Sequence, residues 1–116
     1  MEQITPLLKK YNHFKDAQIR STQQFEDGRK AIQIIVQDDD GQDVAGVEFT
    51  FDKIKEFRLL QNNVLAFLDM MSGVSIIKEN NFYGFALGSG TAMLHVLNAP
   101  MYVVASELSV KELDEF

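Results

Sequence analysis

Regular alternation of apolar and polar residues in the first half of the chain constrains its fold more than any other feature. In two successive segments every second residue is apolar: Ile32, Ile34 and Val36, then Val47, Phe49 and Phe51. A period of two places these side chains on one face of an extended chain, with polar residues such as Glu48 and Asp52 on the other. Such strands are typical of an antiparallel sheet that is covered on one side and wet on the other.

Turn-forming residues separate a longer series of extended segments. Glu26-Asp27-Gly28-Arg29 and the acidic loop 38–43 predict the first two reversals, and Gly88-Ser89-Gly90 and Asn98-Ala99-Pro100 predict the last two. Asn80-Asn81 predicts a two-residue hairpin loop, because asparagine tolerates the positive φ angles that such loops require. The strands predicted between these turns cover residues 19–25, 31–37, 47–52, 54–60, 74–79, 82–87, 91–97 and 101–107.

Two short segments favour helix. Thr5 as N-cap and Pro6 as the first helical residue predict one near the N-terminus. The spacing i, i+3, i+4, i+7 predicts a second over residues 63–71, in which Val64, Phe67, Leu68 and Met71 form the apolar face. A capping-box pattern over 109–112 predicts either a last helical turn or a frayed C-terminal tail.

These elements predict a single globular domain over residues 1–116 with an α+β, mostly β fold. We expect seven to eight antiparallel strands in meander order with one or two short helices. The strands form either one strongly curved sheet or two packed sheets, and the pattern leaves both arrangements open.

The segment 74–107 is apolar on both faces of its predicted hairpins. One face carries bulky side chains such as Phe85, Leu87 and Met93, and the other carries smaller ones such as Gly84 and Ala86. A sheet that is apolar on both sides must be covered on both sides. The cover of the smaller face could be the N-terminal helix, a second subunit or a ligand in a groove.

Composition and charge limit the classes of partner. The formal net charge is −6, so attraction to nucleic acid or to anionic membranes is not expected. The chain has no cysteine, which excludes a thiol nucleophile or a thiolate metal site. No secretory signal and no membrane-spanning run are expected, and a cytoplasmic protein fits these features. We expect no cofactor.

No catalytic constellation is evident. His95 is predicted to lie on the bulky apolar face, either as a hydrogen-bonded core residue or as a base that lines a cleft. His13 has no second ligand at a suitable spacing, so a metal site is not expected. The acidic loop 38–43 fails the register of a calcium loop, which makes a solvated hairpin loop the better interpretation.

Candidate binding residues follow from the doubly apolar sheet. A ligand pocket would involve His95, Tyr102 and Gly84. A protein interface would involve the apolar residues of the smaller face, Phe82, Leu94, Val96 and Tyr102.

The order of elements resembles that of small uncharacterised bacterial domains, some of which are immunity proteins of polymorphic toxin systems. The resemblance rests on His13 and Asp16 before the first strand, on Val47-Glu48-Phe49-Thr50-Phe51, on a strand that contains Phe57 and on a closing meander. It implies a protein that inhibits a partner by binding it, and it transfers no functional residue.

The sequence therefore predicts a non-enzymatic protein-interaction module, which self-associates or binds another protein and could be an immunity-type inhibitor. The alternative is a small-ligand-binding domain or an enzyme with a pocket near His95.

Overall fold

The computed structural model describes residues 1–116 and contains one open antiparallel sheet of six strands. The strands are β1 (Gln18–Gln24), β2 (Lys30–Gln37), β3 (Asp43–Arg58), β4 (Val74–Glu79), β5 (Phe82–Leu87) and β6 (Tyr102–Leu113). The helical segments are α1 (Ile4–Lys10), η1 (Asn12–Phe14), η2 (Asn62–Phe67) and α2 (Met93–Leu97), of which η1 and η2 have 3₁₀ hydrogen bonding. The mostly β, α+β class is confirmed, whereas the predicted number of seven to eight strands is too high.

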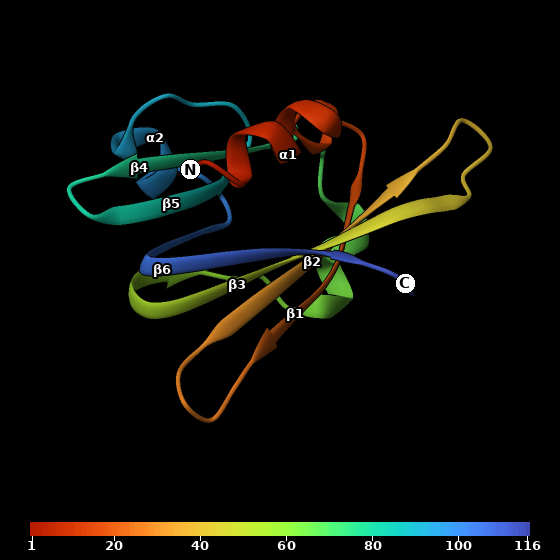
Figure 1. The fold of residues 1–116 in the computed structure, drawn as a ribbon. Helices are drawn as coiled ribbons and strands as arrows, with labels where there is room; N and C mark the ends of the chain where they lie inside the picture. Colours follow the sequence, from red (N-terminus) through yellow and green to blue (C-terminus); the bar gives the residue numbers. More distant parts are fainter.

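The strands are ordered β1-β2-β3-β6-β5-β4, so the predicted meander is wrong. Two hairpin-connected groups, β1-β2-β3 and β4-β5, are joined by the C-terminal strand β6, which lies between β3 and β5. The sheet twists strongly between the two groups, and α1 lies across it (Figure 1). One curved sheet therefore accounts for all six strands.

Strand β3 merges the two strands predicted over 47–52 and 54–60. Its 16 residues bend at Lys53, whose φ angle is +53°, and the pairing with β6 shifts register between Ile54 and Glu56. The bend lets one long strand pair with β2 at its first half and with β6 along most of its length.

The main core lies on one face of the sheet, under α1 and η1. Five aromatic rings run through it, with Tyr11 stacked on Phe14, Phe14 edge-on to Phe49, and both Phe49 and Phe51 beside Phe85. Alternate residues of β2, β3 and β4 reach this core, as the alternating pattern of the sequence predicts, whereas β1 contributes only Ile19.

Helix α2 covers the opposite face of β5 and β6, where residues 91–97 were predicted as a strand. A smaller apolar cluster lies between them, formed by Ala86, Val96, Ala99, Tyr102 and Val104. The intramolecular cover of this face is thus α2, and α1 covers the other face. A second subunit is therefore not needed to cover this face.

Three further boundaries differ from the sequence predictions. Helix α1 begins at Ile4 with Gln3 as N-cap, two residues before the predicted cap Thr5. Residues 109–112 belong to β6 and pair with β3, because the backbone bonds of a long central strand outweigh one capped helical turn. The predicted helix over 63–71 is only the 3₁₀ segment η2, and Leu68 is already extended.

Candidate interaction surfaces

The predicted ligand-binding residues do not meet around a pocket. His95 is exposed on α2 and lies outside every surface hollow of the molecule, and its Nδ1 accepts a hydrogen bond from the Thr91 N–H at 3.3 Å. Its predicted place on a strand is wrong. Gly84 is buried beneath α2, and a β-carbon there would lie 3.0 Å from Met93 Sδ and from Val96 Cγ2. The small face of the sheet therefore admits α2.

The predicted interface residues are largely covered by their own chain. Val96 and Tyr102 are buried, and the Tyr102 hydroxyl donates to Glu56 Oε1 at 2.9 Å, which raises the pKa of Tyr102. The Phe82 ring lies under the Lys55 ammonium, 4.7 Å from Nζ. Leu94 alone of the four is strongly exposed, because it lies on the outer side of α2.

The acidic loop between β2 and β3 is a hydrogen-bonded hairpin loop, as predicted. Asp38 Oδ1 accepts from the N–H groups of Asp40 and Gln42, both at 2.9 Å, and Asp43 pairs with Arg20. Nowhere in the structure do three acidic or histidine side chains converge as a metal site would require. Helices α1 and α2, of seven and five residues, are far too short to cross a bilayer.

The η2 segment and the turn that follows it present to solvent three side chains of the predicted apolar helix face. Phe67 is 85% exposed and Met71 74% exposed, with Val64 at 39%. A 3₁₀ helix has three residues per turn, so Val64 and Phe67 align on its outer side while Leu65 turns inward and is buried. We call Val64, Phe67 and Met71 the η2 patch.

A hollow of about 300 Å³ lies beside the η2 patch. Met71 lines it together with Ala66 and Leu68, the two chain neighbours of Phe67. Asp16 and Asp69 also line it, and neither carboxylate forms an ion pair. The surface around Phe67 therefore combines exposed apolar groups with unpaired negative charge.

The sheet has two edges, and the edge at β1 is covered by η2. The Asn62 side chain accepts the Thr22 N–H at 2.9 Å through Oδ1 and donates to the Thr22 carbonyl at 3.4 Å through Nδ2. The amide thereby occupies the place that a neighbouring strand would take at Thr22. Covering an edge with another segment is one way in which proteins keep edge strands from pairing with other chains.

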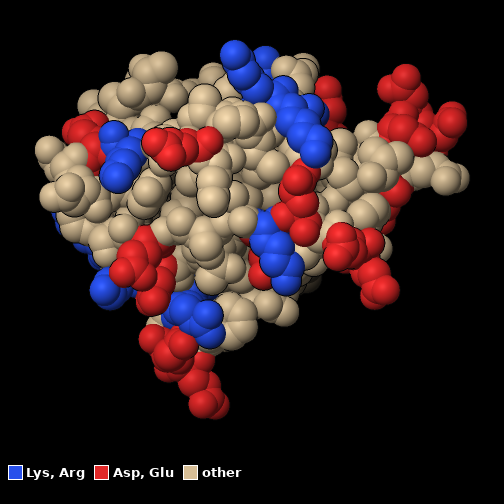
Figure 2. Space-filling model, viewed as in Figure 1, with Lys and Arg blue, Asp and Glu red and all other residues tan.

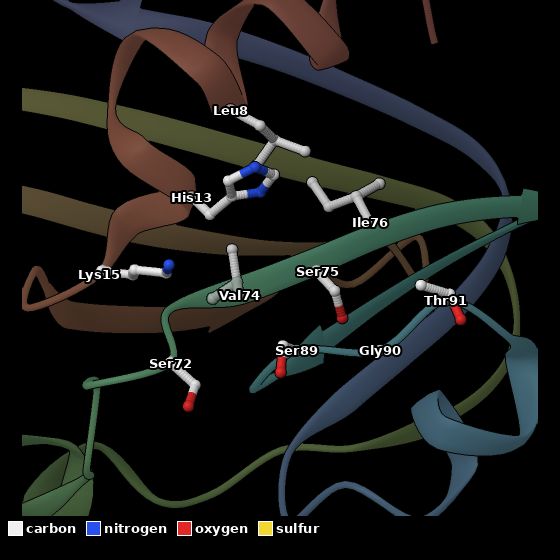
Figure 3. Close-up of a pocket in the computed structure, with 10 residues that line it drawn as sticks. All are labelled: Leu8, His13, Lys15, Ser72, Val74, Ser75, Ile76, Ser89, Gly90 and Thr91. Atoms are coloured by element: carbon white, nitrogen blue, oxygen red, sulfur yellow. The ribbon is translucent and has the colours of Figure 1, made fainter.

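The other edge, at β4, is open in the sense that no strand pairs with it, and Val74 and Ile76 at this edge are only 1% and 6% exposed. A hollow of about 320 Å³ runs along Val74, Ser75 and Ile76, and we call it the β4-edge groove. Figure 3 shows Leu8, His13 and Lys15 along one side of β4, and Ser72, Ser89 and Thr91 along the other. No acidic side chain lines this groove.

Lys15 and His13 in this groove have no acidic partner. The four ion pairs of the molecule involve Lys10, Arg20, Arg29 and Lys53, so the Lys15 charge is not neutralised by an ion pair. Elsewhere acidic groups gather at the tip of the β2–β3 hairpin, and basic groups lie over α1 (Figure 2). The β4-edge groove therefore differs in charge from the rest of an acidic chain.

The sequence held weak signals for these surfaces. His13 was considered as a metal ligand, and Lys15 was not singled out. The spacing of Met93, Val96 and Leu97, i, i+3, i+4, is helical and could have indicated α2. Nothing local in the sequence indicates that β4 is an edge strand.

Comparison with protein-family models, with curated proteins and with solved structures finds no match to this chain.

Proposed function

We propose that the chain is a non-enzymatic protein-interaction domain that binds another protein through the η2 patch. The observation that carries this proposal is the exposure of Phe67, because a phenylalanine buries about 150–250 Å² when it is covered. Exposed large apolar groups that adjoin a hollow are typical of protein-binding sites.

The charge around the patch specifies the kind of partner. Asp16 and Asp69 lie unpaired beside it, and the whole chain carries a net charge of −6. A partner with apolar side chains bordered by lysine or arginine would complement this surface, and a second copy of the chain would not. The immunity-type inhibitor implied by the sequence resemblance is one form of this function, acting in the bacterial cytoplasm on a basic toxin domain.

The distribution of reactive groups also supports a binding role. In the β4-edge groove, His13 has serine hydroxyls nearby but no carboxylate to orient its ring. The hollow beside the η2 patch has carboxylates but no histidine, lysine or arginine. A nucleophile, a base and an orienting group are therefore brought together at neither surface.

The test compares Phe67→Ser with Phe25→Ser, a matched change at an exposed aromatic residue of the β1–β2 turn. Proteins that bind the immobilised chain in a lysate of the native host are identified, purified and titrated against it by calorimetry. We expect direct binding that Phe67→Ser weakens by about 30-fold, the loss expected for a buried aromatic anchor, and that Phe25→Ser leaves unchanged.

Two results would overturn the proposal. One is a purified partner that binds wild type and Phe67→Ser equally. The other is a wild-type chain that sediments as a monomer and captures only proteins that Phe67→Ser captures as well. A wild-type dimer that Phe67→Ser converts to monomer would assign the patch to self-association instead.

A further inference from the structure

The open edge of β4 presents backbone groups that no other part of the chain satisfies. In an antiparallel pair, the N–H and C=O groups of successive residues point alternately toward and away from the neighbouring strand. Gly88 N–H donates to the Gly73 carbonyl at 2.8 Å, and Leu87 N–H donates to the Met101 carbonyl at 3.0 Å. Even-numbered residues of β5 therefore bond toward β4, and odd-numbered ones bond toward β6.

The register then identifies the outward groups of β4. Val74, Ile76 and Lys78 lie opposite Leu87, Phe85 and Tyr83, the odd-numbered residues whose bonds point to β6. The backbone groups of these three residues consequently face the open edge, and none forms a bond outside the sheet. A row of three such residues is the template that an added strand uses. Val74 and Ile76 are almost fully buried and line the β4-edge groove, and Lys78 beyond it is exposed.

The β4-edge groove gives this template walls and a charge. Leu8 and His13 stand over one side of the edge, and Ser89 and Thr91 lie on the other (Figure 3). A strand placed beside β4 would therefore run between two walls. At the Val74 end it would meet Lys15, which is exposed and forms no ion pair.

We propose that the free edge of β4 binds an extended, acidic segment of another polypeptide as a seventh strand, with a carboxylate of that segment beside Lys15 and His13. The Lys15 ammonium supplies the charge, and the ring N–H of His13 and the hydroxyls of Ser72 and Ser89 supply further donors. The main-chain bonds to β4 give affinity, and the cationic end selects acidic sequences.

Charge argues against a second copy of the chain as the occupant. Antiparallel pairing of two β4 edges through their outward residues centres on Ile76 and places Val74 opposite Lys78 of the other copy. Lys78 would then approach Lys15 across the pairing, and like charges on paired strands oppose association. The β4-edge groove shares no residue with the η2 patch, although Ser72 follows Met71 directly and one partner could contact both.

The experiment selects peptides from a phage-displayed random dodecapeptide library on the immobilised full chain. An enriched peptide is synthesised and titrated into ¹⁵N-labelled protein by NMR, together with a version in which amides replace its carboxylates. We expect acidic peptides that shift the amide signals of residues 72–76 and 89–91. Lys15→Glu should weaken binding by about tenfold or more, and Lys9→Glu, the same change on exposed α1, should not.

A second variant tests the strand itself. Lys78→Pro removes an outward N–H and keeps the bonds to β5, so the fold tolerates it while the edge loses a donor. We expect peptide binding to weaken in this variant as well. The proposal is overturned if no peptide is enriched, if Lys15→Glu binds as tightly as wild type, or if sodium glutamate alone shifts the same signals at the same concentration. It is also overturned by a wild-type dimer that Lys78→Pro dissociates.

Discussion

Replacement of Gly73 by alanine tests how η1 is held beside the sheet. Gly73 has a φ angle of +66°, and a β-carbon on it would lie 2.0 Å from the carbonyl oxygen of His13 and 2.9 Å from the Lys15 nitrogen. Both contacts are with backbone, which cannot rotate away. Either loop 70–73 or η1 must therefore shift by more than an ångström to reach an ordinary contact.

Two costs add for Gly73→Ala. The left-handed conformation costs a non-glycine residue about 1–2 kcal/mol, and overpacking of a rigid contact costs about 1–3 kcal/mol. The expected loss in the free energy of unfolding is thus about 2–5 kcal/mol. Gly41→Ala is the matched control, because Gly41 has a φ angle of +79° and nothing within 4 Å of its β-carbon position. Gly41→Ala should lose only the part of the free energy of unfolding that comes from the left-handed conformation.

Urea denaturation followed by circular dichroism measures the difference. With a slope of about 1.5 kcal/mol per molar urea, the midpoint of Gly73→Ala should fall by about 1–3 M, and that of Gly41→Ala by about 1 M. Equal midpoints for the two variants would refute the close approach of η1 to loop 70–73, and with it the position of His13 over the β4 edge.

Three further predictions concern other contacts. Gly84→Ala should destabilise the protein by roughly 1–2 kcal/mol in urea denaturation, since α2 occupies the space of the added methyl group; stabilisation would mean that α2 does not pack there. The hydrogen bonds from Lys10 and Tyr11 lower the pKa of Glu112 in the folded protein. The ionised carboxylate therefore stabilises the fold above the unfolded pKa of about 4.3, and this stabilisation is lost as the pH falls through the folded pKa. Glu112→Gln should therefore lower the urea midpoint at pH 7 and leave it unchanged at about pH 2, and a loss that is equal at both values would contradict this. Asn62→Ala should speed amide exchange at Thr22 by about tenfold or more in NMR, because that N–H loses its acceptor; unchanged exchange would show that Asn62 does not cover the β1 edge.

Local patterns predicted the parts of the fold that depend on local bonds. Alternation identified β2 and the first half of β3, and Asn80-Asn81 identified the β4–β5 hairpin, where both residues have positive φ angles. In each case the side chains that reach the core and the residues that turn the chain are neighbours in sequence. The apolar period and the turn-forming residues are then sufficient to predict the element.

The position of β6 could not be predicted in this way. Whether β6 pairs with β3 or extends a meander is decided by contacts between residues more than 50 positions apart, such as Phe49 with Val110. The sequence did contain a hint, since Met101 to Ala105 is an unbroken apolar run and all five residues are buried. A strand that is apolar on both faces belongs in the middle of a sheet.

The candidate surfaces were missed for two different physical reasons. For the η2 patch, a period of 3.6 was assumed where the chain adopts a period of 3.0, and the change turns Phe67 from the core to solvent. The β4 edge was missed because an edge is a property of strand order. The same residues 74–79 would be a central strand if the chain placed one more strand beside them.

The backbone of η1 connects the strain in this fold to its open edge. Asn12, His13 and Phe14 all have positive φ angles, and each such residue costs about 1–2 kcal/mol. The fully buried Phe14 ring, stacked on Tyr11 and edge-on to Phe49, holds this turn in place. The same turn leaves His13 exposed above β4. A right-handed continuation of α1 would satisfy the backbone at lower cost but would carry the chain away from the edge. The strained turn therefore places the His13 ring beside the unpaired strand β4, where the proposed peptide site lies.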